Sequence, residues 1–154
     1  MNASCVSDCP LLKLLLTLLV STVLPGCGEN VPFDIVPVNG KVTYEDGSLI
    51  PANSLLVTFN PVRTGEKGKL APPGGQTNVN VQDGTFSSVS SHRANDGLAV
   101  GKHKVVIVSF KKGPQGAPTP SAAVPAIYRQ ESSTPLEVDV NSSNQFLELK
   151  VRKK

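Results

Sequence analysis

Residues 104–110, with the sequence KVVIVSF, form the most strongly β-branched run in this chain of 154 residues. Val105 and Ile107 would fall on one face of an extended strand, and the apolar residues between and beyond them would fall on the other. A strand whose two faces are both apolar is stable only when other parts of the protein pack against each face. We therefore expect residues 104–110 to lie in the interior of a sheet.

Six further segments alternate apolar and polar side chains with the period of two that is typical of half-buried strands. These segments are residues 38–44, 55–60, 77–82, 85–89, 136–140 and 147–151. Asp46-Gly47 and Asp83-Gly84 supply turns, because Asp-Gly tolerates positive φ. The sequence therefore predicts an all-β domain over residues 36–154, folded as a seven-stranded antiparallel β-sandwich.

Two long connections, residues 61–75 and 111–126, are rich in glycine and proline. Connections longer than about 12–15 residues are uncommon in compact domains unless they are functional or loosely ordered. We expect both to be solvent-exposed insertions.

The N-terminal region has a different pattern. Residues 11–24, LLKLLLTLLVSTVL, are largely apolar, but the run is shorter than the roughly 18 residues of a permanent membrane span. Pro25 and Gly26 break the helix directly before Cys27. A short apolar helix that ends in this way is typical of a secretory signal.

Residues 24–27, LPGC, resemble the lipobox of bacterial lipoproteins. Leu24 matches the aliphatic position, Gly26 the small residue before the cleavage site, and Cys27 the cysteine that receives diacylglycerol; Pro25 stands where a small residue is usual. The resemblance implies a signal peptide over residues 1–26, then a lipidated Cys27 and a tether over 27–35. An uncleaved membrane anchor and an N-terminal helix of the domain are the alternatives.

Cysteine usage agrees with a lipoprotein. The chain has three cysteines, and cleavage before Cys27 would remove Cys5 and Cys9. The exported domain would then hold no free thiol, and we expect no cofactor. Two acyl chains on Cys27 would anchor it stably, because one chain alone binds a membrane only marginally. We expect the protein on the bacterial cell membrane, at its periplasmic face or on the outer membrane.

Five stretches of the exported part carry a family resemblance: residues 38–47, 57–61, 83–86, 101–107 and 124–140. In this order they resemble small bacterial lipoproteins with a transthyretin-like, carboxypeptidase-regulatory-like β-sandwich domain. His103 stands where the family commonly has a tyrosine. The resemblance implies a prealbumin-like, immunoglobulin-like sandwich and, for most members, no catalytic activity.

Two enzyme classes share this kind of fold, and the sequence lacks the motifs of both. Hydroxyisourate hydrolases end in Tyr-Arg-Gly-Ser, whereas this chain ends in VRKK. Intradiol dioxygenases bind iron through two tyrosines and two histidines, the histidines two residues apart; here His92 and His103 are 11 apart. We therefore assign no catalytic residue and no metal ligand.

The remaining polar residues favour structural roles. His103 shares the parity of Val105 and Ile107, so we expect a partly buried histidine at the edge of the core. Residues 87–92, SSVSSH, are interpreted as a polar turn rather than a Ser-His pair. Asp46, Asp83 and Asp96 each precede glycine and are interpreted as turn residues.

The only basic cluster lies at the C-terminus: Lys150, Arg152, Lys153 and Lys154. Such a cluster could contact an anionic membrane surface, at about 1 kcal/mol per charge; the alternative is a solvated, frayed tail. A net charge of +3 and few, scattered aromatic residues give no indication of nucleic-acid binding.

These observations lead to one expected function and two alternatives. We expect a non-catalytic, membrane-anchored envelope lipoprotein that acts as an interaction or scaffolding module, with an envelope protein or a polysaccharide as partner. The first alternative is a carbohydrate or small-molecule binding module. The second is an unrecognised transthyretin-like hydrolase.

Overall fold

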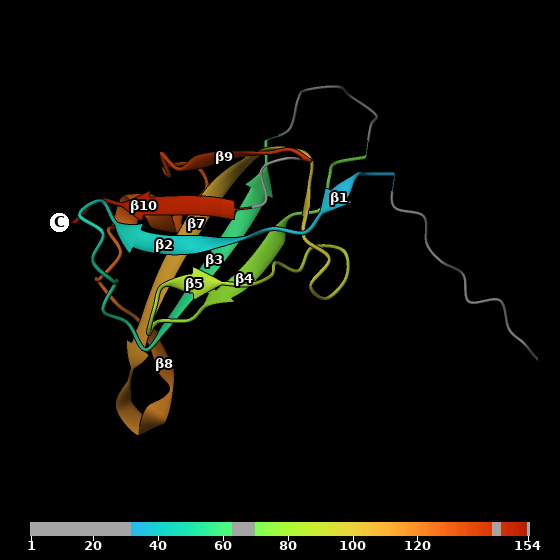
Figure 1. Ribbon diagram of the computed structural model, residues 1–154. Coiled ribbons are helices and arrows are strands. Elements are labelled where there is room, and N and C mark those ends of the chain that lie inside the picture. Colours follow the sequence, from blue (N-terminus) through green and yellow to red (C-terminus); the bar gives the residue numbers. More distant parts are fainter. Residues whose placement is uncertain (1–31, 63–69, 143–145, 154) are drawn as a thin grey trace, which may run out of the picture. The chain divides into compact units, whose positions relative to one another are not determined.

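The computed structural model describes residues 32–62, 70–142 and 146–153 (Figure 1). The expected signal peptide, the expected cleavage motif Leu24, Pro25, Gly26 and Cys27, most of the expected tether, and Lys154 lie outside the described residues. The described residues all belong to one compact unit, which begins at Pro32.

The described residues form ten strands and two short 3-10 helices, which confirms an all-β fold. The strands are β1 (Ile35–Val36), β2 (Asn39–Tyr44), β3 (Ser54–Pro61), β4 (Gly75–Val79), β5 (Thr85–Phe86), β6 (Leu98–Ala99), β7 (Gly101–Lys112), β8 (Pro118–Pro120), β9 (Glu137–Val140) and β10 (Phe146–Val151). The 3-10 helices are η1 (Pro114–Gly116) and η2 (Ala126–Arg129). In this part of the chain no helix is long and apolar enough to cross a membrane.

These strands form two sheets and a separate two-stranded pair. The larger sheet has the order β4-β3-β7, and both β8 and β9 pair with the far edge of β7. The smaller sheet has the order β10-β2-β5, and β1 pairs separately with β6. The expectation that residues 104–110 lie inside a sheet is confirmed, because β7 has neighbours on both edges.

The smaller sheet departs from the antiparallel pattern that we expected. Strands β10 and β2 run parallel, with Phe146 opposite Asn39 and Val151 opposite Tyr44. The physical reason is the connection. The chain leaves β9 in the larger sheet and reaches β10 in the smaller one, so no hairpin forces the two strands of the pair to run in opposite directions.

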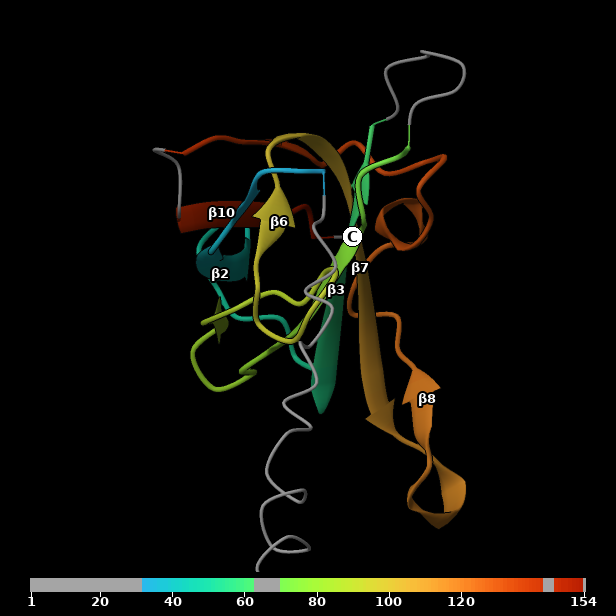
Figure 2. The same ribbon diagram turned by 90° about the vertical axis from the view of Figure 1, so that its right-hand side faces the viewer.

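The core lies between the two sheets, which form separate layers in Figure 2. Val57, Phe59 and Ile107 of the larger sheet and Val42 and Leu149 of the smaller one belong to a single buried cluster. Within this cluster the rings of Phe59 and Phe86 lie 6.2 Å apart and are tilted by 56°.

The connection at residues 111–126 is mostly exposed, as we expected, but part of it is paired as a strand. Strand β7 continues to Lys112, and β8 returns antiparallel to it, with Pro120 opposite Phe110. Proline argues against a central strand, but an edge strand accepts it when the missing N–H would have faced solvent. Beyond β8, Ser121 and Val124 are buried.

Two boundaries also differ from those expected from the sequence. Strand β1 starts at Ile35, the last residue of the expected tether. The connection expected at 61–75 is bounded by β3, which includes Pro61, and β4, which begins at Gly75; residues 63–69 of it are outside the described part.

Candidate functional site

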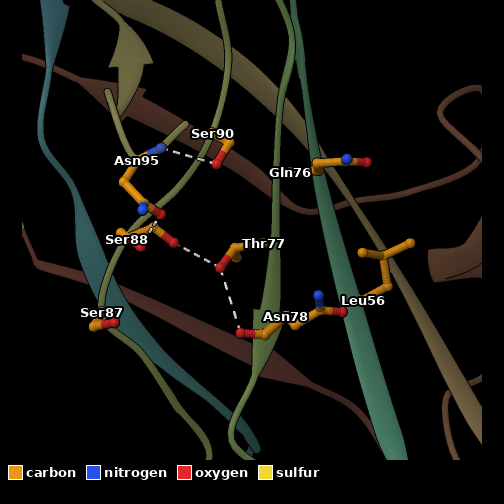
Figure 3. A pocket seen from close by; sticks show the side chains of 8 residues that line it. All are labelled: Leu56, Gln76, Thr77, Asn78, Ser87, Ser88, Ser90 and Asn95. Carbon is orange, nitrogen blue, oxygen red and sulfur yellow. Dashed lines mark hydrogen bonds between the residues drawn. The ribbon is translucent and has the colours of Figure 1, made fainter. Parts of the chain in front are cut away.

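A polar pocket lies at the outer edge of β4, where this strand faces the segment that follows β5 (Figure 3). Its volume is about 320 Å³, at the lower end of the range for ligand pockets, about 300–1,000 Å³. We call it the edge pocket. It is lined by Leu56, Gln76, Thr77, Asn78, Ser87, Ser88, Ser90 and Asn95.

Hydrogen bonds fix one wall of the edge pocket. The Thr77 hydroxyl donates to the carbonyl oxygen of Ser88 at 2.6 Å, and the Ser88 hydroxyl donates to Asn95 Oδ1 at 2.7 Å. The Asn95 backbone N–H donates to the Ser90 hydroxyl at 3.0 Å. These bonds tie the segment 88–95 to β4, so this wall is positioned before any ligand arrives.

Asp96 holds the turn behind this wall. Its Oδ1 accepts hydrogen bonds from the Ser91 backbone N–H at 2.8 Å and from the Ser91 hydroxyl at 3.1 Å. Its Oδ2 accepts from the backbone N–H groups of His92 and Arg93. Burial acts to raise the pKa of the Asp96 carboxyl, but these donors outweigh burial and hold the pKa below its usual value. The interpretation of Asp96 as a turn residue is confirmed.

Two amide groups of the lining lie on the other face of β4 and have no partners. Gln76 and Asn78 project beside Leu56, on the side of the strand away from Thr77 and Ser88 (Figure 3). Both are exposed, and neither side chain makes a hydrogen bond with any residue of the described ranges. Each amide therefore has a donor and an acceptor free for a ligand.

On the outer edge of β4, one residue beside the pocket lacks a backbone hydrogen-bond partner. On this edge, Gln76 exchanges two hydrogen bonds with Ser90, at 2.9 and 3.0 Å, and the Asn80 N–H donates to the Thr85 carbonyl at 2.8 Å. Alternation along the strand directs the backbone groups of Asn78 to the same edge. Among the residues described, Asn78 has no backbone partner there and its carbonyl oxygen has only the Thr77 hydroxyl, at 3.4 Å (Figure 3), so the ladder has a gap one position wide.

The structure does not bring the two histidines of the sequence into one site. His92 is exposed in the turn held by Asp96. His103 is 1% exposed, more deeply buried than we expected, and its Nε2 lies 2.7 Å from the carbonyl oxygen of Ala99. Its Nδ1 is buried without a partner in the described part of the chain, and burial lowers the pKa of this imidazole.

The two tyrosines have structural partners. The Tyr44 hydroxyl donates to the Ala123 carbonyl at 2.7 Å, and the Tyr128 hydroxyl accepts from the Arg152 backbone N–H at 3.1 Å. Within the described ranges, no group of three or more His, Cys, Asp or Glu side chains is placed to hold a metal ion.

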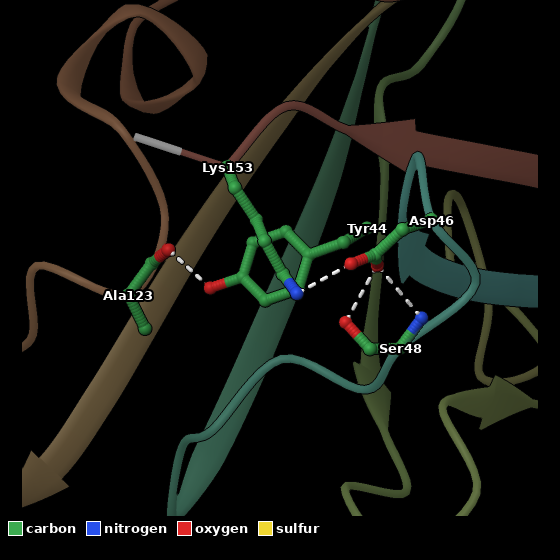
Figure 4. Close-up of polar contacts among 5 residues, drawn as sticks. All are labelled: Tyr44, Asp46, Ser48, Ala123 and Lys153. Atoms are coloured by element: carbon green, nitrogen blue, oxygen red, sulfur yellow. Dashed lines mark hydrogen bonds and ion pairs between the residues drawn. The ribbon is translucent and has the colours of Figure 1, made fainter.

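The described members of the C-terminal basic cluster each lie against a carboxylate. Lys150 Nζ is 3.7 Å from Glu148, and Arg152 Nε is 3.1 Å from Glu45. Lys153 pairs with Asp46 and lies 5.2 Å from the centre of the Tyr44 ring (Figure 4). Donors from Lys153 and Ser48 hold the pKa of Asp46 well below its usual value. Contact between this cluster and a membrane surface stays a prediction.

A second hollow lies next to the Lys153–Asp46 pair. It has a volume of about 420 Å³. Its lining is mostly apolar: Tyr44, Ser48, Leu49, Pro51, Ala122, Ala123 and Lys153. Its charged group, Lys153, is already paired with Asp46, so the hollow offers a ligand fewer free polar groups than the edge pocket does.

Comparison of the chain with protein-family models, with curated proteins and with solved structures finds no match in any of the three. The edge pocket is therefore the candidate site that rests on the geometry of this chain alone. We did not predict it from the sequence. The only signal was the serine-rich segment 87–92, SSVSSH, which we interpreted as a polar turn.

Proposed function

We propose that this protein is an exported lipoprotein, held at a bacterial membrane by acyl chains on Cys27. The LPGC motif at the end of a short apolar run supports this proposal. The start of β1 at Ile35 is also consistent with it, because the first strand then lies only a short stretch of sequence after Cys27.

The β-domain is, in this proposal, a prealbumin-like sandwich. Two sheets that contribute to one buried cluster support the assignment. The parallel β10 and the two-residue strands β1 and β6 are departures from the simple seven-stranded pattern.

The domain acts by binding an envelope component and not by catalysis. The observation that carries this proposal is the edge pocket, where hydrogen bonds fix the polar groups on one face of the β4 edge and the amides of Gln76 and Asn78 are free on the other face. Ligand pockets typically contain a few polar groups in fixed positions, which orient the ligand. A nucleophilic mechanism would instead require a base beside a hydroxyl, and the pocket lining contains neither an imidazole nor a carboxylate.

Photo-crosslinking in intact cells tests this proposal. A diazirine amino acid is placed at position 78 in the full chain, and at the exposed position 82 of the neighbouring turn as the matched control. We expect an adduct with an envelope protein or polymer from position 78 and none from position 82. Equal yields from both positions, or no adduct from either, would overturn the proposal.

A further inference from the structure

We propose that the ligand of the edge pocket is one ring of a neutral, hydroxylated sugar in an envelope polysaccharide. This inference rests on the proposed binding function and adds the chemical class of the ligand. The charge, the size and the hydrogen-bonding groups of the pocket support it, and each of them disfavours other classes of ligand.

The pocket is neutral. Its lining consists of three carboxamides, four hydroxyl groups and Leu56, with no acidic or basic side chain. An ion at such a site has no opposite charge to pair with, so it gains none of the charge-assisted hydrogen bonding on which ionic ligands depend. Phosphate, carboxylate and ammonium ligands are therefore disfavoured, whereas a neutral ligand needs no opposite charge.

The gap in β4 is too short for a peptide strand. An added strand needs a row of unpaired backbone groups, but the outer edge of β4 is closed at Gln76 by Ser90 and at Asn80 by Thr85. Among the described residues between these two positions, Asn78 alone directs its backbone groups to this edge without a backbone partner. A volume of about 320 Å³ fits one compact ring of a longer polymer rather than an extended chain.

Carboxamides match sugar hydroxyls because both groups donate and accept hydrogen bonds. Gln76 and Asn78 have both capacities free, and Asn95 keeps its amide nitrogen available because only its Oδ1 is used by Ser88. Leu56 provides the one apolar surface for the C–H face of a ring. No aromatic ring lines the pocket, so we expect weak binding that depends on the hydrogen bonds.

The test measures the affinity of the full lipidated protein in a sugar-free detergent by saturation-transfer NMR. The neutral probes are N-acetylated chitotriose and maltotriose. Trigalacturonate is the acidic probe of similar size, and tetra-alanine is the probe for strand addition. The variants are Gln76→Met and Asn78→Leu, with Gln82→Met as the matched control, because Gln82 is an exposed amide outside the pocket lining.

We expect saturable binding of at least one neutral trisaccharide. Each pocket variant should weaken that binding by about fivefold or more, as expected for one lost hydrogen bond, and Gln82→Met should leave it unchanged. Circular dichroism of both pocket variants shows whether each is folded, and the two substitutions serve as independent tests.

Three results would overturn the sugar assignment: binding of neither trisaccharide, tighter binding of trigalacturonate or tetra-alanine, and sugar binding that neither pocket variant weakens. The crosslinking experiment separates this failure from failure of the proposed function. If position 78 still gives a specific adduct, the binding function stands and only the ligand class is wrong.

Discussion

His103 shows how one buried side chain links the fold to pH. Its Nε2 contacts the Ala99 carbonyl, which can only accept, so Nε2 carries the proton and Nδ1 is the basic nitrogen. Nδ1 is buried without a partner in the described part of the chain. Protonation would therefore place an unpaired charged N–H in the core, which explains why burial lowers the pKa of His103 below 6.5.

A lowered histidine pKa makes the folded state more stable at neutral pH than in acid. Below pH 6.5 the unfolded chain binds the proton more readily than the folded one. The free energy of unfolding should therefore fall as the pH drops below 6.5, by up to about 1.4 kcal/mol per pH unit from this group. Urea unfolding of His103→Phe between pH 7.5 and 5 should show a smaller loss than the parent. A parent-like loss in that variant would contradict this, and His92→Gln, an exposed imidazole, is the control.

Gly40 is required by the packing of β2 against both β10 and β5. A Cβ at this position would lie 2.2 Å from the carbonyl oxygen of Leu147 and 2.6 Å from Cζ of Phe86. In the sequence, Gly40 only interrupts an apolar set, because a close approach between distant segments leaves no other trace in the alternation.

We therefore expect Gly40→Ala to lower the free energy of unfolding by about 1–3 kcal/mol, the usual cost of overpacking a core. The adjacent, exposed Asn39→Ala should change it by less than about 0.5 kcal/mol. Urea titration of both variants measures the difference. Equal stability of the two would show that Gly40 has room for a methyl group.

At the scale of elements, alternation predicts every long strand and one short strand, β5, but not the short strands β1, β6 and β8. The seven expected segments all contain strand, because half-buried strands repeat every two residues. Strands β1 and β6 have two residues each, too few to show a period. The parallel pairing of β10 could not be predicted either, since a period of two does not encode which strand lies alongside.

The same limit applies to the edge pocket. Leu56, the segment 76–78 and the segment 87–95 meet only because β3 pairs with β4 and the later segment folds back on β4. Each piece alone is an ordinary strand or turn. The polar character of the pocket is present in the sequence, but its assembly is a tertiary property.

Strand β10 should be necessary for the fold of the whole domain. Leu147, Leu149 and Val151 are each at most 3% exposed, and together they contribute about 5–9 kcal/mol of hydrophobic stabilisation, comparable with the whole stability of a typical domain, about 5–15 kcal/mol. Removing residues 146–154 should abolish the cooperative thermal transition seen by circular dichroism. Removing only residues 153–154 should preserve it, because the strand remains. A cooperative transition in the longer truncation would contradict the role of β10.

At the scale of the whole molecule, the proposed function combines a lipid anchor with a domain that binds an envelope component. Each buried methylene contributes about 0.8 kcal/mol to membrane affinity, so two acyl chains hold a protein far more firmly than one. An anchored domain needs only weak affinity for a polymer that is abundant beside the membrane, because attachment already places the two together. The neutral edge pocket is suited to this kind of weak, repeated contact.

The most direct test is metabolic labelling of the full chain with a palmitate analogue in a bacterial host, followed by membrane fractionation. We predict a labelled protein in the membrane fraction, cleaved before Cys27. Cys27→Ala should abolish both label and cleavage, whereas Cys5→Ala and Cys9→Ala should retain both. An unlabelled, uncleaved chain in the soluble fraction of the parent, or full labelling of Cys27→Ala, would contradict the assignment of a lipid anchor on Cys27.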